Sequence, residues 1–334
     1  MNKKINLGIM GFGHVGRYIY TNTLNSDIFN VKAISDIGRI ESLNYLLNND
    51  PRNKNLGVEI DSNSLVFNGN KTRFVHGVSP GDIPWDALGV DWVIDASGKF
   101  LDKITLSKHI QAGAKKVILA CLPNDDLDNI IIPGINESEA NSSDNIITAG
   151  SSTTNAYALM LKILNDFNSI KSSSLTTIHS YTSDQPLLDL AKSDLKRSRS
   201  AAKNIIPNKN LSYEWIEKVI PYMKNKIFSS ALNVPVQFGS LLDITTVFEN
   251  SINSEEEINS VIDSAAKKYP NLITVNNDPI VSSDVLGMSE SIVFDRVGTL
   301  KIGENMVKTL SWYDNGFNHA SRILEVISIY EDLK

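Results

Sequence analysis

A run of small polar residues, Ser-Ser-Thr-Thr-Asn at positions 151–155, lies between an apolar stretch at 146–148 and apolar residues at helical spacing over 157–164. This pattern predicts a strand, a tight turn and a helix. The turn places side chains beside the unpaired backbone N–H groups of a helix N-terminus, which suit an anion or a developing oxyanion. The same residues also suit an ordinary capped helix, because Ser and Thr are preferred N-caps.

A glycine-rich segment follows the first apolar run of the chain. Residues 5–10 predict a buried strand, and a helix is expected to begin near Arg17. In this context the motif G-x-G-x-x-G permits a tight turn and the close approach of backbone to a pyrophosphate. The predicted cofactor-binding residues of this loop are Gly11, Phe12, Gly13, His14, Val15 and Gly16.

Asp36 lies 20 residues after Gly16, at the end of a second apolar run over 30–34. A carboxylate at this distance accepts hydrogen bonds from ribose hydroxyls and repels a 2′-phosphate, which favours NAD over NADP. Arg39 lies close enough to leave NADP open. The alternative for Asp36 is the N-cap of the next helix.

Further apolar runs at 90–96, 114–120 and 129–134 alternate with helical stretches such as 104–111. The alternation predicts a parallel, doubly wound sheet. The first of these runs ends at Ser97 and Gly98, a turn of the kind that closes over a dinucleotide, and both are predicted to contact the cofactor. Cys121 follows the second run, and we expect it to be a small buried residue and not a nucleophile.

The pattern changes after about residue 172. Strands are expected at 174–179, 229–235, 240–248, 299–302 and 307–313, and helices at 254–268 and 317–333. Strands without regular helix alternation predict a mostly antiparallel sheet with helices on one face. The predicted fold class is therefore α/β: a Rossmann doubly wound parallel sheet followed by an α+β domain.

Composition excludes several classes of protein. The chain has 334 residues and a net charge of −6, so it lacks the basic footprint of a nucleic-acid-binding protein. Its apolar runs are shorter than the ~20 residues that a membrane span needs. Cys121 is the only cysteine, which rules out an internal disulfide or a cysteine-based metal cluster, and we expect no metal. The N-terminus lacks a signal-peptide pattern, so a cytoplasmic location is expected.

Four segments together resemble the glyceraldehyde-3-phosphate dehydrogenase family, and the similarity extends over essentially the whole chain. These segments are residues 8–17, 152–155, 179–185 and 311–315. The loop at 194–207 also resembles the family's subunit-interface loop. The resemblance implies NAD as cofactor and a homotetramer that acts on a small molecule. It also implies a cofactor domain over 1–150, completed by a C-terminal helix at 316–334, and a catalytic domain over 151–315.

The resemblance also implies roles for individual residues. Ser152 lies where the family has its nucleophilic cysteine, and His179, 27 residues later, corresponds to the family's base. Asn315 corresponds to the residue that helps to fix the nicotinamide amide. A buried structural histidine is the alternative for His179. The residues expected to contact the substrate are Ser151, Thr153, Thr182, Asp184, Asn210 and Asn233.

The departures from the family pattern are concentrated around the substrate. Asn233 replaces a phosphate-binding arginine, and Asn210-Leu211 replaces a Thr-Gly pair that lines the inorganic phosphate site. Around the cofactor, Met10 and His14 replace an asparagine and an arginine, and His319 replaces a tyrosine near the nicotinamide. A serine hydroxyl is far less acidic than a thiol, so the family's thiolate chemistry does not transfer directly.

Two hypotheses follow from these residues. The first is an NAD-dependent oxidoreductase acting on an aldehyde or alcohol, in which His179 takes the proton and Ser152 binds the substrate oxygen. Because the phosphate subsites are altered, this enzyme is not expected to have the family's phosphorylating activity. The second is a catalytically silent homologue that binds NAD or a partner. A residual phosphorylating activity that uses Ser152 is a weaker third possibility.

Overall fold

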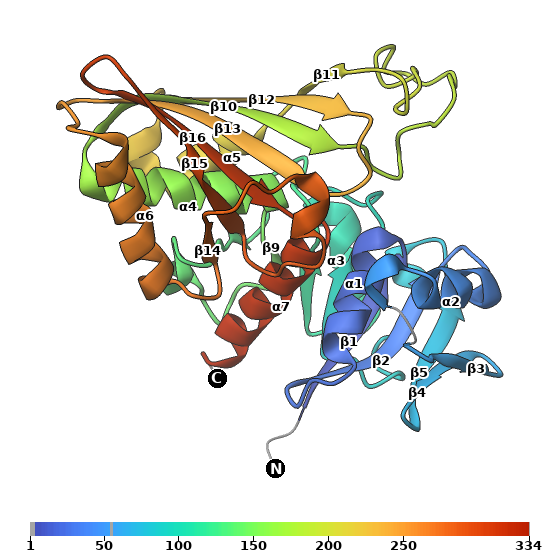
Figure 1. Ribbon diagram of the computed structural model, residues 1–334. Helices are drawn as coiled ribbons and strands as arrows, with labels where there is room; N and C mark the ends of the chain where they lie inside the picture. The colour runs from blue at the N-terminus through green and yellow to red at the C-terminus, as the bar shows by residue number, and fades with distance from the viewer. Residues whose placement is uncertain (1–3, 54–55, 334) are drawn as a thin grey trace. The chain divides into compact units, whose positions relative to one another are not determined.

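We describe the protein from a computed structural model, which covers residues 4–53 and 56–333 (Figure 1). The chain divides into two compact units. Within the described residues, the first unit comprises the chain up to Ile132, the segment Glu137–Gly150 and the chain from His319 onward. The second unit comprises Pro133–Asn136 and Ser151–Asn318.

The first unit is built on a nine-stranded sheet with the strand order β3-β4-β5-β2-β1-β6-β7-β9-β8. The strands from β5 to β8 in this order pair in parallel, as expected for a doubly wound sheet. Strands β6 and β7 are buried along their whole length and are apolar apart from Asp95 and Lys116 at their ends, as is typical of strands covered on both faces. The strands are β1 (Ile5–Met10), β2 (Phe29–Asp36), β3 (Glu59–Asp61), β4 (Ser64–Phe67), β5 (Asn70–His76), β6 (Trp92–Asp95), β7 (Lys116–Leu119), β8 (Asn129–Ile130) and β9 (Ile146–Thr148).

An antiparallel extension at one edge of this sheet was not expected from the sequence. Strand β4 pairs antiparallel with both β3 and β5. The turn between β4 and β5 is Asn68-Gly69, and both residues have positive φ angles (48° and 79°), as a two-residue hairpin turn requires. Strands β3 and β5 carry exposed polar side chains and β4 has only four residues, so no long apolar run marks this extension.

The helices of the first unit are α1 (His14–Thr23), α2 (Ile40–Asn48) and α3 (Lys103–Gln111), together with α7 (Phe317–Glu331) from His319 onward. Helix α7 is tied to distant parts of the unit. Trp92 Nε1 donates to Glu331 Oε1 at 2.6 Å, and the Tyr330 hydroxyl donates to Asp144 Oδ2 at 2.6 Å. At the other end of the helix, His319 Nε2 lies 3.0 Å from the Ala120 carbonyl oxygen, to which it donates.

His319 makes the stability of the protein depend on pH. Burial lowers the pKa of His319 to about 4, whereas an unfolded histidine titrates near pH ~6.5. As the pH falls from the unfolded pKa to the folded one, the unfolded chain binds a proton at this position and the folded protein does not. The free energy of unfolding therefore decreases, by about 3 kcal/mol in total.

We therefore expect wild type to lose about 2 kcal/mol more than His319→Gln when the pH is lowered from 7 to 5. The glutamine variant keeps an amide that can donate to Ala120 but has no group that titrates. Urea unfolding of both proteins at the two pH values measures this difference. Equal losses would contradict the expectation.

The second unit is built on a seven-stranded sheet with the order β11-β12-β10-β13-β16-β15-β14. The β12–β10 and β15–β14 pairs are parallel and the other neighbours antiparallel, so the predicted mostly antiparallel sheet is confirmed. The strands are β10 (Ile170–Ser180), β11 (Ile206–Lys209), β12 (Ile227–Val234), β13 (Ser240–Phe248), β14 (Ile273–Asn276), β15 (Ile292–Ile302) and β16 (Met306–Tyr313).

Helices α4 (Ser152–Phe167), α5 (Ser212–Val219) and α6 (Glu255–Lys268) lie on one side of this second sheet (Figure 1). Along β12, β13 and β16, buried residues alternate with more exposed ones. Such alternation is typical of a sheet with one covered face. Among the described residues, no helix is long and apolar enough to cross a membrane.

Candidate functional site

The glycine-rich loop of the first unit has the shape that a dinucleotide needs. Gly11 has a φ of +92°, and a Cβ there would lie 2.6 Å from the backbone of Ser97. A Cβ on Gly16 would lie 2.1 Å from the Gly11 carbonyl oxygen, so this contact also requires glycine. By contrast, no atom lies within 4 Å of a Cβ built on Gly13, the N-cap of α1. This open space at a helix N-terminus fits a pyrophosphate.

Asp36 joins this loop to the end of β2. Its Oδ2 accepts the Phe12 backbone N–H at 2.6 Å, and its Oδ1 accepts the Gly38 N–H at 2.7 Å. The N-cap of α2 is Arg39, so the alternative interpretation of Asp36 as that N-cap is wrong. The carboxylate therefore lies beside the glycine loop, where a ribose-binding acid belongs.

The turn after β6 completes this edge of the first sheet. The Ser97 hydroxyl donates to Asp95 Oδ1 at 2.6 Å, and Gly98 has a φ of +67° with open space around it. The loops that contain Gly11, Asp36 and Ser97 follow β1, β2 and β6, which are parallel neighbours. Doubly wound sheets bind ligands at the carboxyl ends of such strands.

Cys121 also follows a strand of this edge, after β7, but its thiol is not poised to react. Burial, and to a smaller degree the charge of Asp95, raise the pKa of Cys121 to about 12. Its side chain packs against an apolar cluster of the first unit and is partly exposed, so the residue is less buried than expected. The thiol is the un-ionised form at neutral pH.

In the second unit, the start of α4 separates a capping serine from a candidate functional one. Ser151 is the N-cap: its Oγ accepts the Thr154 N–H at 3.1 Å. Ser152 is the first helical residue and is 7% exposed. The two interpretations of this segment are therefore compatible. Ser151 caps the helix, and Ser152 lies in its first turn, beside the unpaired backbone N–H groups.

Tyr313, which the sequence analysis did not single out, connects the start of α4 to β10. Its hydroxyl lies 2.8 Å from Thr153 Oγ1 and 3.0 Å from Thr177 Oγ1. Its ring also lies edge-on to the ring of His179, with 6.4 Å between centroids. The hydroxyl groups of Thr153 and Tyr313 thus hold the first turn of α4 close to the end of β10. Only the folded structure reveals this, since no local pattern marks a strand tyrosine as a contact.

His179 is oriented by the main chain. Its Nδ1 lies 2.6 Å from the Ser180 carbonyl oxygen. Because a carbonyl only accepts, the proton is on Nδ1, and Nε2 carries the lone pair of the neutral ring. Burial lowers the pKa of His179, and the positive charge of Arg197 acts in the same direction. The imidazole is therefore neutral at pH 7, which is the form that accepts a proton.

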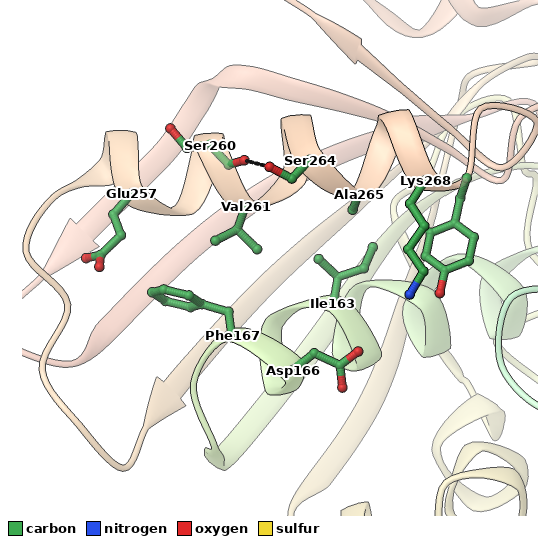
Figure 2. A pocket seen from close by; sticks show the side chains of 10 residues that line it. Ile163, Asp166, Phe167, Glu257, Ser260, Val261, Ser264, Ala265 and Lys268 are labelled. Carbon is green, nitrogen blue, oxygen red and sulfur yellow. Dashed lines mark hydrogen bonds between the residues drawn. The ribbon is translucent and has the colours of Figure 1, made fainter.

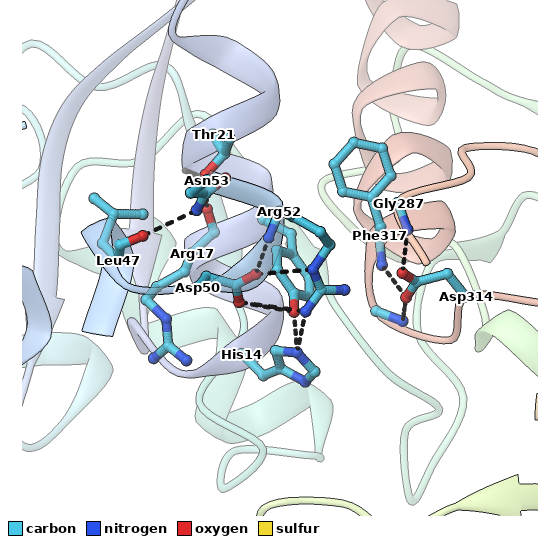
Figure 3. Close-up of polar contacts among 12 residues, drawn as sticks. His14, Arg17, Thr21, Leu47, Asp50, Arg52, Asn53, Gly287, Asp314 and Phe317 are labelled. Atoms are coloured by element: carbon cyan, nitrogen blue, oxygen red, sulfur yellow. Dashed lines mark hydrogen bonds and ion pairs between the residues drawn. The ribbon is translucent and has the colours of Figure 1, made fainter. Parts of the chain in front are cut away.

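Asn315 lies beside the same strand end. The Ser180 hydroxyl donates to Asn315 Oδ1 at 3.0 Å. The preceding Asp314 accepts the backbone N–H groups of Gly287 at 2.8 Å and Phe317 at 3.1 Å, which fixes the loop (Figure 3). The structure therefore brings the ends of β10 and β16 together with the start of α4.

Thr182 and Asp184 form a polar group with Arg197 in the loop after β10. The Thr182 hydroxyl and the Arg197 guanidinium both donate to the Asp184 carboxylate. Partial burial alone would raise the pKa of Asp184, but these two donors hold it below its ordinary value. Arg197 is thus paired with a carboxylate whose charge acts on the pKa of His179 in the opposite direction.

The two asparagines predicted to contact substrate have different surroundings. Asn233 lies directly opposite His179 in the β10–β12 register and is 5% exposed. Its Oδ1 accepts the Asn208 side-chain amide at 3.3 Å. Asn210 Oδ1 accepts the backbone N–H of Ser212 at 2.9 Å, at the start of α5. Asn233 is therefore placed beside the candidate base, whereas Asn210 supports a helix start.

A groove in the second unit lies elsewhere, between α4 and α6 (Figure 2). Its floor includes Ile163, Phe167 and Val261, and its rim includes Asp166 and Lys268. It holds none of the predicted site residues. Within the part of the chain that the structure describes, no three His, Cys, Asp or Glu side chains are grouped so that they could hold a metal ion.

Comparisons with known proteins match segments of both units to one family. Residues 5–103 match the family model of the glyceraldehyde 3-phosphate dehydrogenase NAD binding domain, and residues 151–315 match that of its C-terminal domain. The chain is 34% identical over 324 residues to glyceraldehyde-3-phosphate dehydrogenase 1 of Bacillus cereus, over 96% of both chains. It is 37% identical over 329 residues to the glyceraldehyde-3-phosphate dehydrogenase of Thermotoga maritima, over 97% of this chain and 98% of the relative.

Proposed function

Because the chain belongs to the glyceraldehyde-3-phosphate dehydrogenase family of NAD-binding oxidoreductases, we propose that it oxidises or reduces an aldehyde or alcohol with NAD, without the phosphorylating step. The observation that carries the proposal is the orientation of His179. Its Nδ1–H is held by the Ser180 carbonyl, so Nε2 is available as a base although the nucleophile position holds Ser152.

We assign the following roles to the residues of the chain. The glycine-rich loop and Asp36 would hold NAD, which would supply a hydride acceptor for the substrate carbon. His179 Nε2 takes the proton from the hydroxyl group of an alcohol or of a hydrated aldehyde. Ser152 and the N-terminal turn of α4 hydrogen-bond the substrate oxygen and favour its developing negative charge. Removal of a hydride and a proton leaves a carbonyl or carboxyl product, so no covalent acyl-enzyme is needed.

The substrate subsites favour a molecule without a phosphate group. Asn233 is neutral where the family has a phosphate-binding arginine, and Arg197 is paired with Asp184. The loss of a charge-assisted hydrogen-bond donor weakens the binding of a phosphate by about 2–3 kcal/mol. Leu211, at the start of α5, adds an exposed apolar side chain where the family has a small residue.

Calorimetric titration with NAD and NADP, followed by absorbance assays with a panel of aldehydes and alcohols, tests the proposal. We expect tighter binding of NAD than of NADP, since Asp36 repels a 2′-phosphate. We also expect NADH to form with at least one substrate that lacks phosphate. NAD binding without turnover of any panel member would instead support the silent homologue, for which the loss of the thiol is the motivating observation.

We also propose a cytoplasmic homotetramer. Large apolar side chains are exposed on the second unit, both on its sheet strands and in the loop at 187–205. They are Phe228, Val297, Leu300 and Ile302 on the strands, and Leu187, Leu188, Leu190, Leu195 and Ile205 in the loop. Such clusters favour contact between subunits. Light scattering should give four times the chain mass of 36.9 kDa, and a monomer would contradict the proposal.

A further inference from the structure

A continuous chain of hydrogen bonds joins three buried side chains of the first unit: Trp85, His109 and Asp95. Trp85 Nε1 lies 3.0 Å from His109 Nδ1, and His109 Nε2 lies 3.1 Å from Asp95 Oδ2. An indole N–H only donates, so Nδ1 accepts this bond, and Nε2 carries the proton that is donated to the carboxylate. All three residues are 0% exposed. The direction of every bond in this chain is therefore fixed.

The elements around this chain keep its two donors in place. His109 belongs to α3, where it and Leu106 are the buried residues of the helix. The Trp85 ring packs against β1: a Cβ built on Gly8 would lie 2.6 Å from the ring, which occupies the space that a side chain at this position would need. Trp85 and His109 therefore form a rigid support for the Asp95 carboxylate.

The other carboxylate oxygen of Asp95 holds the turn that follows β6. Oδ1 accepts the Ser97 backbone N–H at 3.0 Å and the Ser97 hydroxyl at 2.6 Å. Ser97 Oγ in turn accepts the Lys99 backbone N–H at 3.2 Å. The Ser97 backbone also lies against the glycine-rich loop, because a Cβ on Gly11 would lie 2.6 Å from it. The position of Asp95 therefore sets the position of a turn that packs directly on this loop.

We propose that His109 is a positioning residue for the dinucleotide. With its ring fixed by Trp85, it donates to Asp95 Oδ2 and so holds the carboxylate whose Oδ1 shapes the turn beside the cofactor. Gly98, the next residue of this turn, has a φ of +67° and open space around it, which a dinucleotide can approach. The inference rests on NAD binding and not on turnover. It assigns a cofactor role to a helix residue outside the motifs that predicted the site.

Serine, histidine and aspartate are also the groups of a hydrolytic triad, but their order here excludes one. In a triad the histidine takes the proton of the serine hydroxyl. Here the Ser97 hydroxyl donates to Asp95. Both nitrogens of His109 are already used, one by Trp85 and the other by Asp95. The imidazole has no lone pair left for a nucleophile, so the chain of hydrogen bonds can position the turn but cannot activate its serine.

The first test is the affinity of the full chain for NAD, measured by calorimetry at neutral pH for wild type and three variants of His109. In His109→Leu the carboxylate of Asp95 loses its donor, and we expect NAD to bind about tenfold more weakly, the effect of losing one hydrogen bond to a charged group. The amide of His109→Gln has the reach of Nε2 and can donate to Asp95, so its affinity should be within about threefold of wild type. His109→Asn is too short to donate to Asp95, although it can accept from Trp85, and should be as weak as His109→Leu.

A second measurement needs no NAD. Hydrogen exchange followed by mass spectrometry reports the backbone N–H groups of Ser97 and Lys99, which this network holds. In His109→Leu and His109→Asn their exchange should be on the order of tenfold faster than in wild type, and in His109→Gln it should be close to wild type. Peptides from β2 should exchange alike in all four proteins, because a rise over the whole unit would mean a loss of stability and not of the turn.

Leu106→Ala is the matched control. It removes buried apolar volume from α3, one turn before His109, and leaves every hydrogen bond of the network in place. The cavity lowers the stability of the unit. The affinity for NAD and the exchange of the segment 96–100 should nevertheless remain those of wild type.

Three outcomes would overturn the proposal. One is a His109→Leu protein that binds NAD as tightly as wild type. Another is equal weakness of His109→Gln and His109→Asn, which would mean an effect of packing alone. The third is that NAD fails to slow the exchange of the segment 96–100 in wild type, since the turn would then not border the cofactor. This last measurement needs no variant, so it decides even where a variant does not fold, as judged by circular dichroism. A wild type that binds NAD but turns over no substrate contradicts the proposed function and leaves this inference intact.

Discussion

Replacing His179 with alanine is expected to lower the rate of NADH formation by roughly 10²- to 10⁴-fold, the usual contribution of a positioned general base. The expectation follows from the neutral imidazole, whose Nδ1–H is fixed by Ser180 and whose Nε2 is the proton acceptor. Steady-state kinetics with the best substrate of the panel measures the loss. The affinity for NAD should not change, because the glycine-rich loop belongs to the other unit.

The pH profile gives this experiment a second readout. Burial lowers the pKa of His179, so the base stays neutral until the pH falls below the ordinary histidine value near ~6.5. The wild-type rate should therefore be constant above that pH and fall on the acid side as His179 is protonated. The residual rate of His179→Ala should lack this acid limb. Ser174→Ala, an exposed position on the same strand, is the matched control and should behave as wild type.

Equal rates in wild type and His179→Ala would rule out His179 as the base. Measurable turnover would then have to depend on other residues. If neither protein shows turnover, the silent homologue is the better description, and the variant should still bind NAD.

Replacing Ser152 with cysteine is expected to create the most reactive thiol of the protein. The first turn of a helix and a nearby histidine both favour the thiolate. The pKa of Cys121, in contrast, is raised to about 12. At pH 7 we therefore expect iodoacetamide to label the introduced thiol on the order of 10³-fold faster than Cys121, or more. Intact-protein mass spectrometry with time measures both rates.

Two proteins control this measurement. Wild type carries Cys121 alone and reports the slow background. The double variant Ser152→Cys/His179→Ala should be labelled more slowly than Ser152→Cys, because the imidazole no longer stabilises the thiolate. If the introduced thiol is as slow as Cys121, the start of α4 does not activate a nucleophile, and the proposed binding of a substrate oxygen by Ser152 loses its basis.

The sequence predicted those parts of the fold whose signal is local. Most parallel strands of the first sheet lie in mainly apolar stretches, although the polar β5 does not, and the glycine loop is constrained by contacts between residues close in the chain, such as Gly11 and Gly16. The hairpin of β4 and β5 was missed although Asn68-Gly69 is a strong turn signal, because β4 has only four residues and β5 is mostly polar and exposed. Strands β11 and β14, of four residues each, are too short for periodicity to mark.

The candidate site divides in the same way. Ser152, His179 and Asn315 were found through motifs, but the contacts that orient their side chains were not predicted. Tyr313 contacts residues far away in the chain, and no spacing rule links it to Thr153. Long-range contacts of polar side chains have no sequence period, so their partners emerge only from the fold.

The division of the chain into units has a consequence for how the protein is made. The second unit is complete once residue 318 has been synthesised, in the first turn of α7, whereas the first unit needs the rest of α7 to supply the partners of Trp92 and Asp144. A growing chain that has reached residue 318 therefore holds every element of the second unit, while the dinucleotide sheet, although translated earlier, still lacks its last helix. We expect the later-encoded unit to mature first on the ribosome, with NAD binding appearing only after α7 has been synthesised.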